Sequence, residues 1–180
     1  MEHINLYYID SPMPREKFSR LYEIMEYSFP PTERGSEALH YSELSRPEFR
    51  CLCYEPENLP LAFLNYYEFP ENKTIFVEHF AVSQELRGHG TGTALMEQLK
   101  LMTAPFLIVL EVEPPEGPTE RRRVEFYKRL GFHINGGEYF QPEFYGKTPA
   151  IPLKLMTTRP LGEKEFSELS KFIHKRVYKK

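Results

Sequence analysis

Apolar and polar residues alternate with two different periods in the first half of the chain. Residues 15–27 carry an apolar stripe at helical spacing, which predicts an amphipathic helix. The stripe consists of Phe18, Leu21, Tyr22 and Met25. A second, short helix is expected at about 37–45. Shorter apolar runs between turn signals predict strands at 6–9, 49–55, 60–69 and 74–82. The last three follow one another closely, so we expect an antiparallel meander.

The pattern changes after residue 82, where a glycine-rich turn leads into a further helix. Three apolar residues at helical spacing mark this helix: Leu95, Leu99 and Met102. A continuous apolar run follows at 106–110 and is typical of a strand covered on both faces. A strand, a crossover helix and a second strand form a right-handed parallel unit. We therefore expect strands 74–82 and 106–110 to pair in parallel, with a ligand at their carboxyl edge.

The last third of the chain predicts a helix, two strands and a terminal helix. Thr119 is placed to cap a helix at 120–130, and Gly131 fits the C′ position after it. Two further strands are expected at 132–140 and 151–157. An amphipathic helix at about 163–178 packs either on the protein's own sheet or on a second subunit. With no linker long enough to divide domains, residues 1–180 are expected to form one mixed α/β domain.

The turn Arg87-Gly88-His89-Gly90-Thr91-Gly92 is the strongest candidate for a ligand site. Its three alternating glycines lack the Cβ that would hold a ligand away from the backbone. The N-terminus of the following helix presents unpaired N–H groups and the positive end of the helix dipole. Arg87 adds a forked cationic donor. The turn therefore predicts binding of a phosphate-bearing ligand, against the alternative of a purely structural turn.

Two common phosphate loops match this turn less well. The nucleoside-triphosphate loop requires a lysine after its glycines, and none is present here. The dinucleotide fingerprint requires a third glycine where the chain has Thr93. Glu111 does lie at the next strand, where that fold needs an acidic residue, so a nicotinamide-dependent oxidoreductase stays an alternative.

The third phosphate-loop signature, [QR]-x-x-G-x-[GA], matches residues 87–92 at every position and is that of the GNAT acetyltransferases. The surrounding segments also resemble this superfamily. Residues 76–82 are similar to its fourth strand, Leu110-Glu111-Val112 to the end of its fifth, and residues 126–132 to its F-Y-x-x-x-G-F segment. The order and spacing agree over residues 76–134. The chain departs from the family pattern at Glu120 and Arg123, where many members have Asn and Ala.

The resemblance implies a mixed, mostly antiparallel central sheet of about six to seven strands with flanking helices. It also implies an acetyl-CoA-dependent N-acetyltransferase that transfers the acetyl group directly to a primary amine of a small molecule or protein in a ternary complex. A non-catalytic coenzyme A-binding module on the same fold is the alternative. The cofactor-binding residues that it implies are Phe80, Ala81, Val82, Arg87, Gly88, His89, Gly90, Thr91, Gly92, Thr93 and Tyr127.

Acetyl transfer from a thioester to an amine needs a base for the amine and an acid for the leaving thiolate. Tyr127 falls on the tyrosine of the family motif, whose hydroxyl can protonate the sulfur. Glu111 matches an acidic residue that some family members use, and Glu78 lies on the neighbouring expected strand. Either carboxylate, water or another group could be the base.

Composition restricts the partners of the chain. A net charge of −3 gives no reason to expect binding to nucleic acid or an anionic membrane. No signal peptide or membrane span is recognisable, and Cys51 and Cys53 suit a reducing compartment, so we expect a cytoplasmic protein. The six histidines show no metal-ligand spacing, so no metal is expected. Glu33 and Glu143 could attract a cationic amine, and a homodimer is possible through the terminal helix.

Overall fold

The computed structural model describes residues 2–31, 34–143 and 149–179, and the chain divides into two compact units, Met1–Pro105 and Phe106–Lys180. Together they give the mixed α/β composition that the sequence predicts. The described residues contain eight strands, slightly more than expected. Glu33 lies outside them. The expectation of a single domain stays a prediction, and each unit is described by itself.

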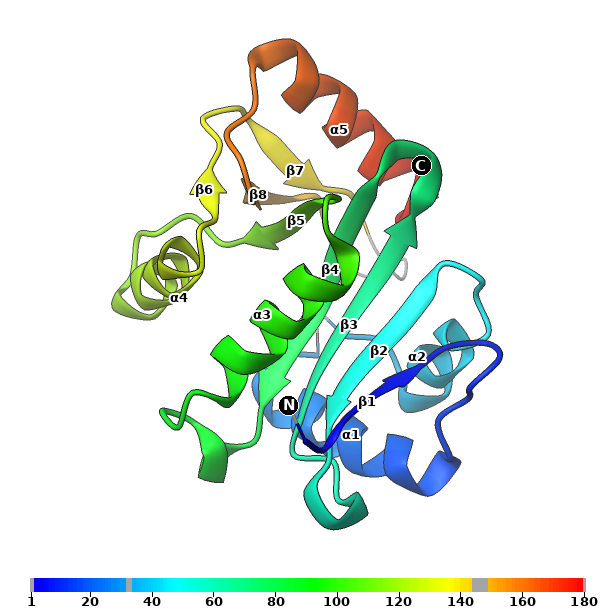
Figure 1. Cartoon of the computed structure of the whole chain (residues 1–180). Helices are drawn as coiled ribbons and strands as arrows, with labels where there is room; N and C mark the ends of the chain where they lie inside the picture. The colour runs from blue at the N-terminus through cyan, green and yellow to red at the C-terminus, as the bar shows by residue number, and fades with distance from the viewer. Residues whose placement is uncertain (1, 32–33, 144–148, 180) are drawn as a thin grey trace. The chain divides into compact units, whose positions relative to one another are not determined.

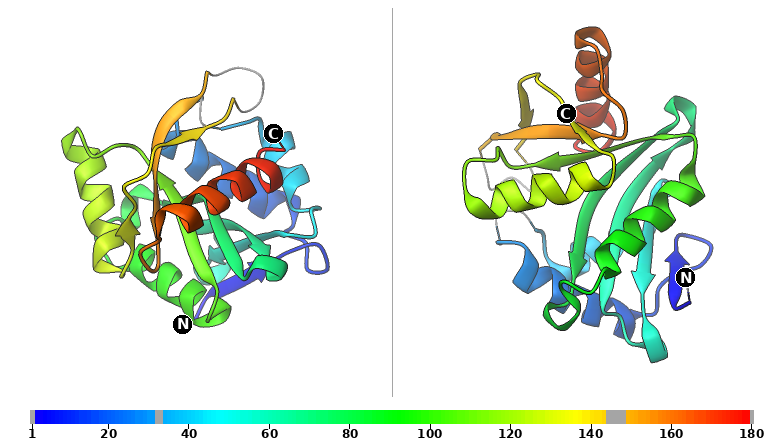
Figure 2. Two further views of the ribbon diagram at one scale, coloured as in Figure 1. Left: turned by 90° about the horizontal axis from the view of Figure 1, so that it is seen from above. Right: turned by 60° about the vertical axis from the view of Figure 1, so that its left-hand side comes forward.

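The first unit is built on an antiparallel sheet in the order β1-β2-β3-β4 (Figure 1). Its strands are β1 (Ile4–Tyr7), β2 (Phe49–Tyr54), β3 (Ala62–Phe69) and β4 (Thr74–Val82). Its helices are α1 (Arg15–Ser28), α2 (Glu37–Glu43) and α3 (Thr91–Thr103). The two orientations of Figure 2 show α3 on one face of this sheet and α1 with α2 on the other. The expected meander is therefore confirmed.

Both faces of this sheet are covered, so its strands are almost continuously buried. Phe63 and Leu64 point to opposite faces of β3, and neither is exposed. Cys51 and Cys53 are free and buried in β2, as expected for small core residues. On α3 the buried stripe is Leu95, Met96, Leu99 and Thr103. The prediction that Met102 belongs to it is wrong, since this side chain is 43% exposed.

The second unit contains strands and helices around a central β8. Its elements are β5 (Leu107–Val112), α4 (Pro118–Arg129), β6 (His133–Ile134), β7 (Tyr139–Gln141), β8 (Ile151–Thr157) and α5 (Glu163–Arg176). The strands β5, β6 and β7 each pair antiparallel with β8. Helix α4 begins with Gly117 as its N-cap and Pro118 at N1. The predicted Thr119 cap is therefore wrong, because proline is favoured in the first helical position.

The predicted strand 132–140 is interrupted in its middle. Asn135 is 7% exposed there, and its Nδ2 donates to Leu155 O at 3.1 Å and to Thr157 Oγ1 at 2.9 Å. Its Oδ1 accepts from the Leu161 backbone at 3.2 Å. A side chain that bonds to backbone in this way replaces ladder hydrogen bonds. The single predicted strand is therefore two short strands, β6 and β7.

Helix α5 packs on its own unit, which was one of the two arrangements expected. The ring of Phe166 lies so close to Gly137 that a Cβ there would be 2.2 Å from the ring carbon Cε1. The Phe166, Leu169 and Ile173 side chains are buried on this face. In the part of the chain that is described, every helix is too short or too polar to cross a bilayer.

Replacing Gly137 with alanine should lower the free energy of unfolding by about 1–3 kcal/mol, because overpacking forces the Phe166 ring or the helix to move. Urea unfolding followed by circular dichroism measures this loss. Gly136→Ala is the matched control, since a Cβ on Gly136 meets nothing within 4 Å. Equal stability of the two variants would contradict the close packing of α5 at Gly137.

Candidate active site

The glycine-rich turn forms an exposed loop at the N-terminus of α3. Gly88 and Gly90 have φ values of +83° and +82°, in the left-handed region that favours glycine. Gly90 is the N-cap and provides no side chain. The Ala94 amide donates to Gly90 O at 3.0 Å. The amides of Thr91, Gly92 and Thr93 therefore lie at the helix end, where a phosphate can accept from them.

Arg87 is held beside this loop by contacts within the same unit. Its Nε donates to Val82 O at 3.2 Å, and its Nη2 lies 3.4 Å from Ser28 Oγ. The guanidinium is exposed, as are Gly88, His89 and Gly90. His89 Nδ1 lies 3.1 Å from Arg87 O. The loop thus combines backbone donors with a permanent cation.

The predicted pantetheine-binding residues lie at the end of β4. Phe80, Ala81 and Val82 pair with Leu64, Phe63 and Ala62 of β3 in regular antiparallel register. β4 is the last strand in the first unit's own sheet. Alternate backbone groups of residues 80–82 therefore point away from β3 and can bond to another partner.

Glu78 occupies a β-bulge in β4. His79 pairs with Asn65, but the next pair is Val77 with Tyr66, so Glu78 is an extra residue between them. A bulge breaks the strict alternation of side chains and redirects the inserted one. Glu78 and His79, adjacent in sequence, consequently lie close together, with His79 Nδ1 3.4 Å from Glu78 Oε2.

The carboxylate of Glu78 is enclosed in a polar cluster, and its side chain is 8% exposed. Tyr67 OH lies 3.4 Å from Glu78 Oε1 but donates its proton to Glu43 Oε2, which is closer at 2.8 Å. Arg46 Nη1 bonds to the same Glu43 oxygen at 2.9 Å.

Burial raises the pKa of Glu78, but His79, His40 and Arg46 outweigh this effect. The pKa therefore lies below its ordinary value, and Glu78 is an anion at neutral pH.

In the second unit Glu111 of β5 accepts hydrogen bonds on both oxygens. Tyr139 OH donates to Oε1, and Tyr178 OH donates to Oε2 at 2.6 Å. Gln141 Nε2 donates in turn to Tyr178 OH at 3.0 Å. Burial and the charge of Glu111 raise the pKa of both tyrosines, so both stay protonated donors. This network ties β5 to β7 and to the residues that follow α5.

Tyr127 lies in the last turn of α4, and the motif around it is a Schellman cap. Gly131 N–H donates to Lys128 O at 2.9 Å, and Phe132 N–H donates to Tyr127 O at 3.0 Å. Gly131 has φ +82°, which confirms its predicted C′ position. The Tyr127 and Phe132 rings form the accompanying apolar contact, with centroids 5.7 Å apart. Burial raises the pKa of Tyr127 to about 12, so its hydroxyl is protonated at neutral pH.

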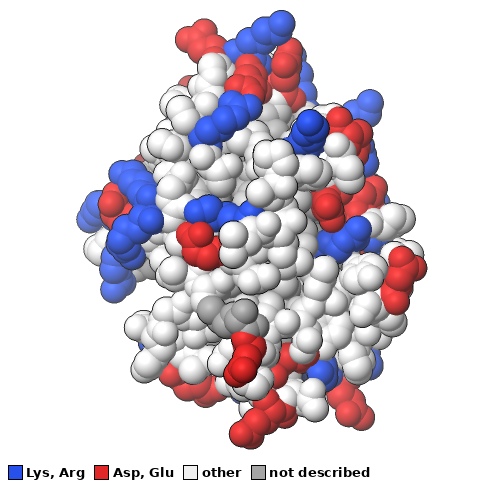
Figure 3. All heavy atoms as spheres, in the orientation of Figure 1, with Lys and Arg blue, Asp and Glu red and all other residues white. Residues whose placement is uncertain are grey.

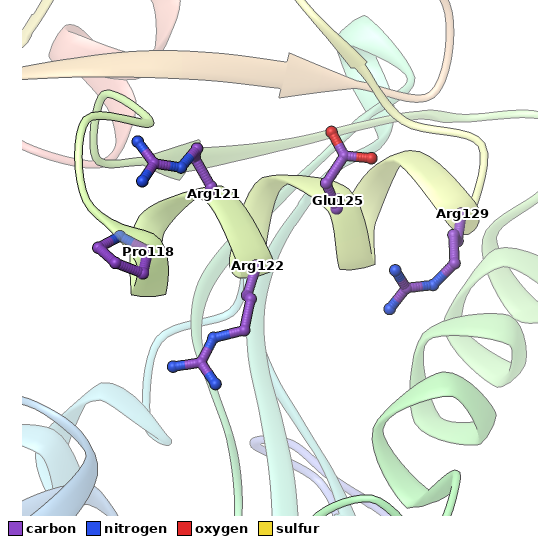
Figure 4. Close-up of a pocket in the computed structure, with 5 residues that line it drawn as sticks. All are labelled: Pro118, Arg121, Arg122, Glu125 and Arg129. Atoms are coloured by element: carbon purple, nitrogen blue, oxygen red, sulfur yellow. The ribbon is translucent and has the colours of Figure 1, made fainter.

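Helix α4 also carries basic side chains on its surface. They gather at the left of Figure 3, where Figure 1 draws α4. Arg121, Arg122 and Arg129 line a shallow depression with Pro118 and Glu125 (Figure 4). Arg123, by contrast, pairs with Glu113. This surface has the charge to attract an anion.

Four residues of these networks were not predicted from the sequence: His40 and His79 beside Glu78, and Tyr139 and Tyr178 on Glu111. His40, Glu78 and His79 offer ligand atoms within 4.8 Å of one another. Spacing along the chain gave no sign of this cluster, because α2 and β4 are distant in sequence. The only available signal was the adjacent pair Glu78-His79, which an unbulged strand would place on opposite faces.

Residues 16–132 match the model of the acetyltransferase (GNAT) family. YjbC of Bacillus subtilis (strain 168), named as a candidate acetyltransferase, is 35% identical over 113 residues. That alignment covers 62% of this chain and only 55% of YjbC.

Solved structures agree with this assignment. A candidate GNAT-family acetyltransferase from Bacteroides thetaiotaomicron has a TM-score of 0.84 at 28% identity, covering 97% of each chain. An aminoglycoside 6'-N-acetyltransferase complexed with coenzyme A has a TM-score of 0.62 at 19% identity, covering 88% of this chain and 99% of its own. The family model, the motif around Tyr127 and the loop at α3 lead to the same conclusion: this protein belongs to the GNAT acetyltransferase family.

Proposed function

We propose that the protein is an acetyl-CoA-dependent N-acetyltransferase that acetylates a primary amine of a small molecule or protein by direct transfer. The observation that carries this proposal is the N-terminus of α3, where no side chain caps the helix and two glycines hold left-handed backbone. Such an end suits a diphosphate. The coenzyme A complex of the aminoglycoside acetyltransferase supports the same ligand.

In this proposal the coenzyme diphosphate accepts hydrogen bonds from the backbone N–H groups between Gly88 and Thr93, and Arg87 and His89 lie beside it. The pantetheine arm bonds to backbone groups of Phe80, Ala81 and Val82. These contacts explain why the loop needs glycine conformations and an exposed cation.

The reaction moves one acetyl group and two protons. The amine nitrogen attacks the thioester carbonyl and loses a proton to a carboxylate. The tetrahedral intermediate then collapses with cleavage of the C–S bond, and the departing thiolate takes the Tyr127 hydroxyl proton. The products are the amide and coenzyme A thiol; the carboxylic acid releases its proton to solvent, and solvent restores the proton on Tyr127. A hydroxyl with a pKa of about 12 is protonated when the thiolate forms.

We propose Glu78 as the base and Glu111 as the second candidate. Both oxygens of Glu111 already accept a tyrosine hydroxyl. The Tyr67 hydroxyl next to Glu78 donates to Glu43 instead. Protonation of Glu78 therefore disrupts fewer hydrogen bonds than protonation of Glu111. The bulge at Glu78 supports this choice, because bulges often redirect a side chain beside an active site.

The acceptor is proposed only by chemical class. An anionic Glu78 and the exposed Glu143 favour an amine that is cationic before it loses its proton. The aminoglycoside that the related enzyme is named for belongs to this class. Cytoplasmic location and a homodimer stay predictions.

Calorimetry with coenzyme A tests the cofactor site. The protein should bind coenzyme A, and Gly90→Ala should raise Kd about tenfold, because left-handed backbone costs a residue with a Cβ about 1–2 kcal/mol. Gly136→Ala, outside the loop, should leave Kd unchanged. No binding at millimolar coenzyme A, or equal Kd values for the native protein and Gly90→Ala, would contradict the site. Thermal stabilisation by NAD but not by coenzyme A would favour the oxidoreductase alternative.

A further inference from the structure

The side chains packed around Glu78 have no role in the proposed steps of acetyl transfer. His79 lies next to Glu78 in the bulge and is 5% exposed. Its Nδ1 is 3.4 Å from Glu78 Oε2. The ring is held between two others by edge-to-face contacts. The Phe29 centroid lies 4.8 Å away and that of His40 5.1 Å away.

His40 has a defined tautomer. The Gly35 backbone N–H donates to His40 Nε2 at 3.1 Å, so a neutral His40 ring carries its proton on Nδ1. Burial, followed by the charge of His79, lowers the pKa of His40 to about 4. His40 is therefore a neutral ring at physiological pH, fixed by the backbone at the start of α2.

This tautomer decides between two functions for the cluster of His40, Glu78 and His79. A cation bound at His40 Nδ1 would need a lone pair there and a proton on Nε2, which would then face the Gly35 N–H. A cation bound at Nε2 would displace the Gly35 hydrogen bond. The cluster therefore suits hydrogen bonding around a carboxylate better than metal coordination.

We propose that His79 is a positioning residue for Glu78: its Nδ1 edge orients the carboxylate, and His40, fixed by Gly35, holds the His79 ring in place. This inference rests on the proposed function in so far as Glu78 is the base. The electrostatic effect of His79 on Glu78 exists whether or not the protein transfers acetyl groups. The role of His79 and the proposed function can therefore be tested separately.

Other charged groups around Glu78 must stay constant in the test. The titratable and charged side chains that face the cluster are Tyr67 from β3, His40 and Glu43 from α2, Arg46 after α2, and Arg34, whose charge acts on His40. None of them is altered when His79 alone is replaced. A change in the titration of Glu78 can then be assigned to His79.

Two variants at His79 test whether the position of the N–H group matters or only the presence of a polar side chain. The amide nitrogen of Asn can occupy the place of Nδ1, whereas that of Gln reaches the place of Nε2. His79→Asn keeps an N–H near Glu78 Oε2 and loses only the ring charge, so it should raise the Glu78 pKa less than His79→Gln does. In His79→Gln the effect of burial should dominate and raise the pKa of Glu78 by about one unit, a tenfold change in the protonation equilibrium. His133→Gln, at an exposed histidine of β6, is the control.

Carboxyl 13C NMR of glutamate-labelled protein, assigned with Glu78→Gln, measures the titration without any substrate. In parallel, kcat is followed against pH at saturating acetyl-CoA and amine. For His79→Gln the acid limb of kcat should move to higher pH with the NMR titration, and the KM for acetyl-CoA should stay constant. Unchanged Glu78 titration in His79→Gln, or equal effects of Asn and Gln, would overturn the positioning role. A shifted titration without acetyl transfer by the native protein would support the role of His79 and refute the proposed function.

Discussion

The Glu78→Gln variant is expected to lose about 100- to 10,000-fold in kcat, the usual contribution of a positioned general base. Gln has the same shape as Glu but cannot accept the amine proton. Glu78 is an anion at neutral pH because His79 and Arg46 lower its pKa against the effect of burial, and His40 adds to this only where it is protonated. In the native protein the basic form is lost only when the pH falls below that lowered pKa. Activity should therefore persist into mildly acidic solution.

Calorimetry separates this loss of chemistry from a loss of binding. Glu78→Gln should bind coenzyme A like the native protein, because the proposed cofactor contacts are made by the loop 87–93 and by backbone of β4. Glu68→Gln on β3, where the carboxylate forms a half-exposed ion pair with Arg50, is the matched control and should keep native kcat. If Glu111→Gln abolished transfer and Glu78→Gln did not, Glu111 would be the base.

The Tyr127→Phe variant is expected to lower kcat about 100-fold or more, because the thiolate would leave without a proton donor. Its Kd for coenzyme A should change little, since the change removes one hydroxyl and keeps the ring between Phe126 and Phe132. The loss should depend on the leaving group: a thioester of a more acidic thiol needs less protonation and should be impaired less.

The pH profile gives a second test of Tyr127. Its pKa of about 12 keeps the hydroxyl protonated through the neutral and mildly alkaline range. Titration of Tyr127 therefore does not lower activity in that range, and the pH profiles of the native protein and Tyr127→Phe should have the same shape there. Tyr54→Phe in β2 is the control. Equal turnover by the native protein and Tyr127→Phe would remove the acid role of this residue.

The motifs that the sequence revealed are those whose structure is local. The F-Y-x-x-x-G-F segment could be recognised because Tyr127, Gly131 and Phe132 make one helix cap over six residues. The loop at Gly88 and Gly90 could be recognised because left-handed backbone restricts residue type at these positions. The helix stripe of Phe18 and Met25 likewise depends only on helical period.

The features that the sequence did not reveal depend on pairing between distant segments. The bulge at Glu78 is an offset between β3 and β4, and neither strand alone contains it. The contact between His40 and His79 joins α2 to β4. The break at Asn135 depends on acceptors in β8. In each case the deciding partner is at least 14 residues away, as the Asn65–His79 pair shows.

The most direct measurement is the release of coenzyme A thiol from acetyl-CoA in the presence of a panel of primary amines, with the native protein and Glu78→Gln in parallel. The native protein is expected to acetylate at least one cationic amine, and Glu78→Gln is expected to bind coenzyme A but to transfer at least about 100-fold more slowly. Release by neither protein with any amine, or release at equal rates by both, would contradict the proposed function and the role of Glu78.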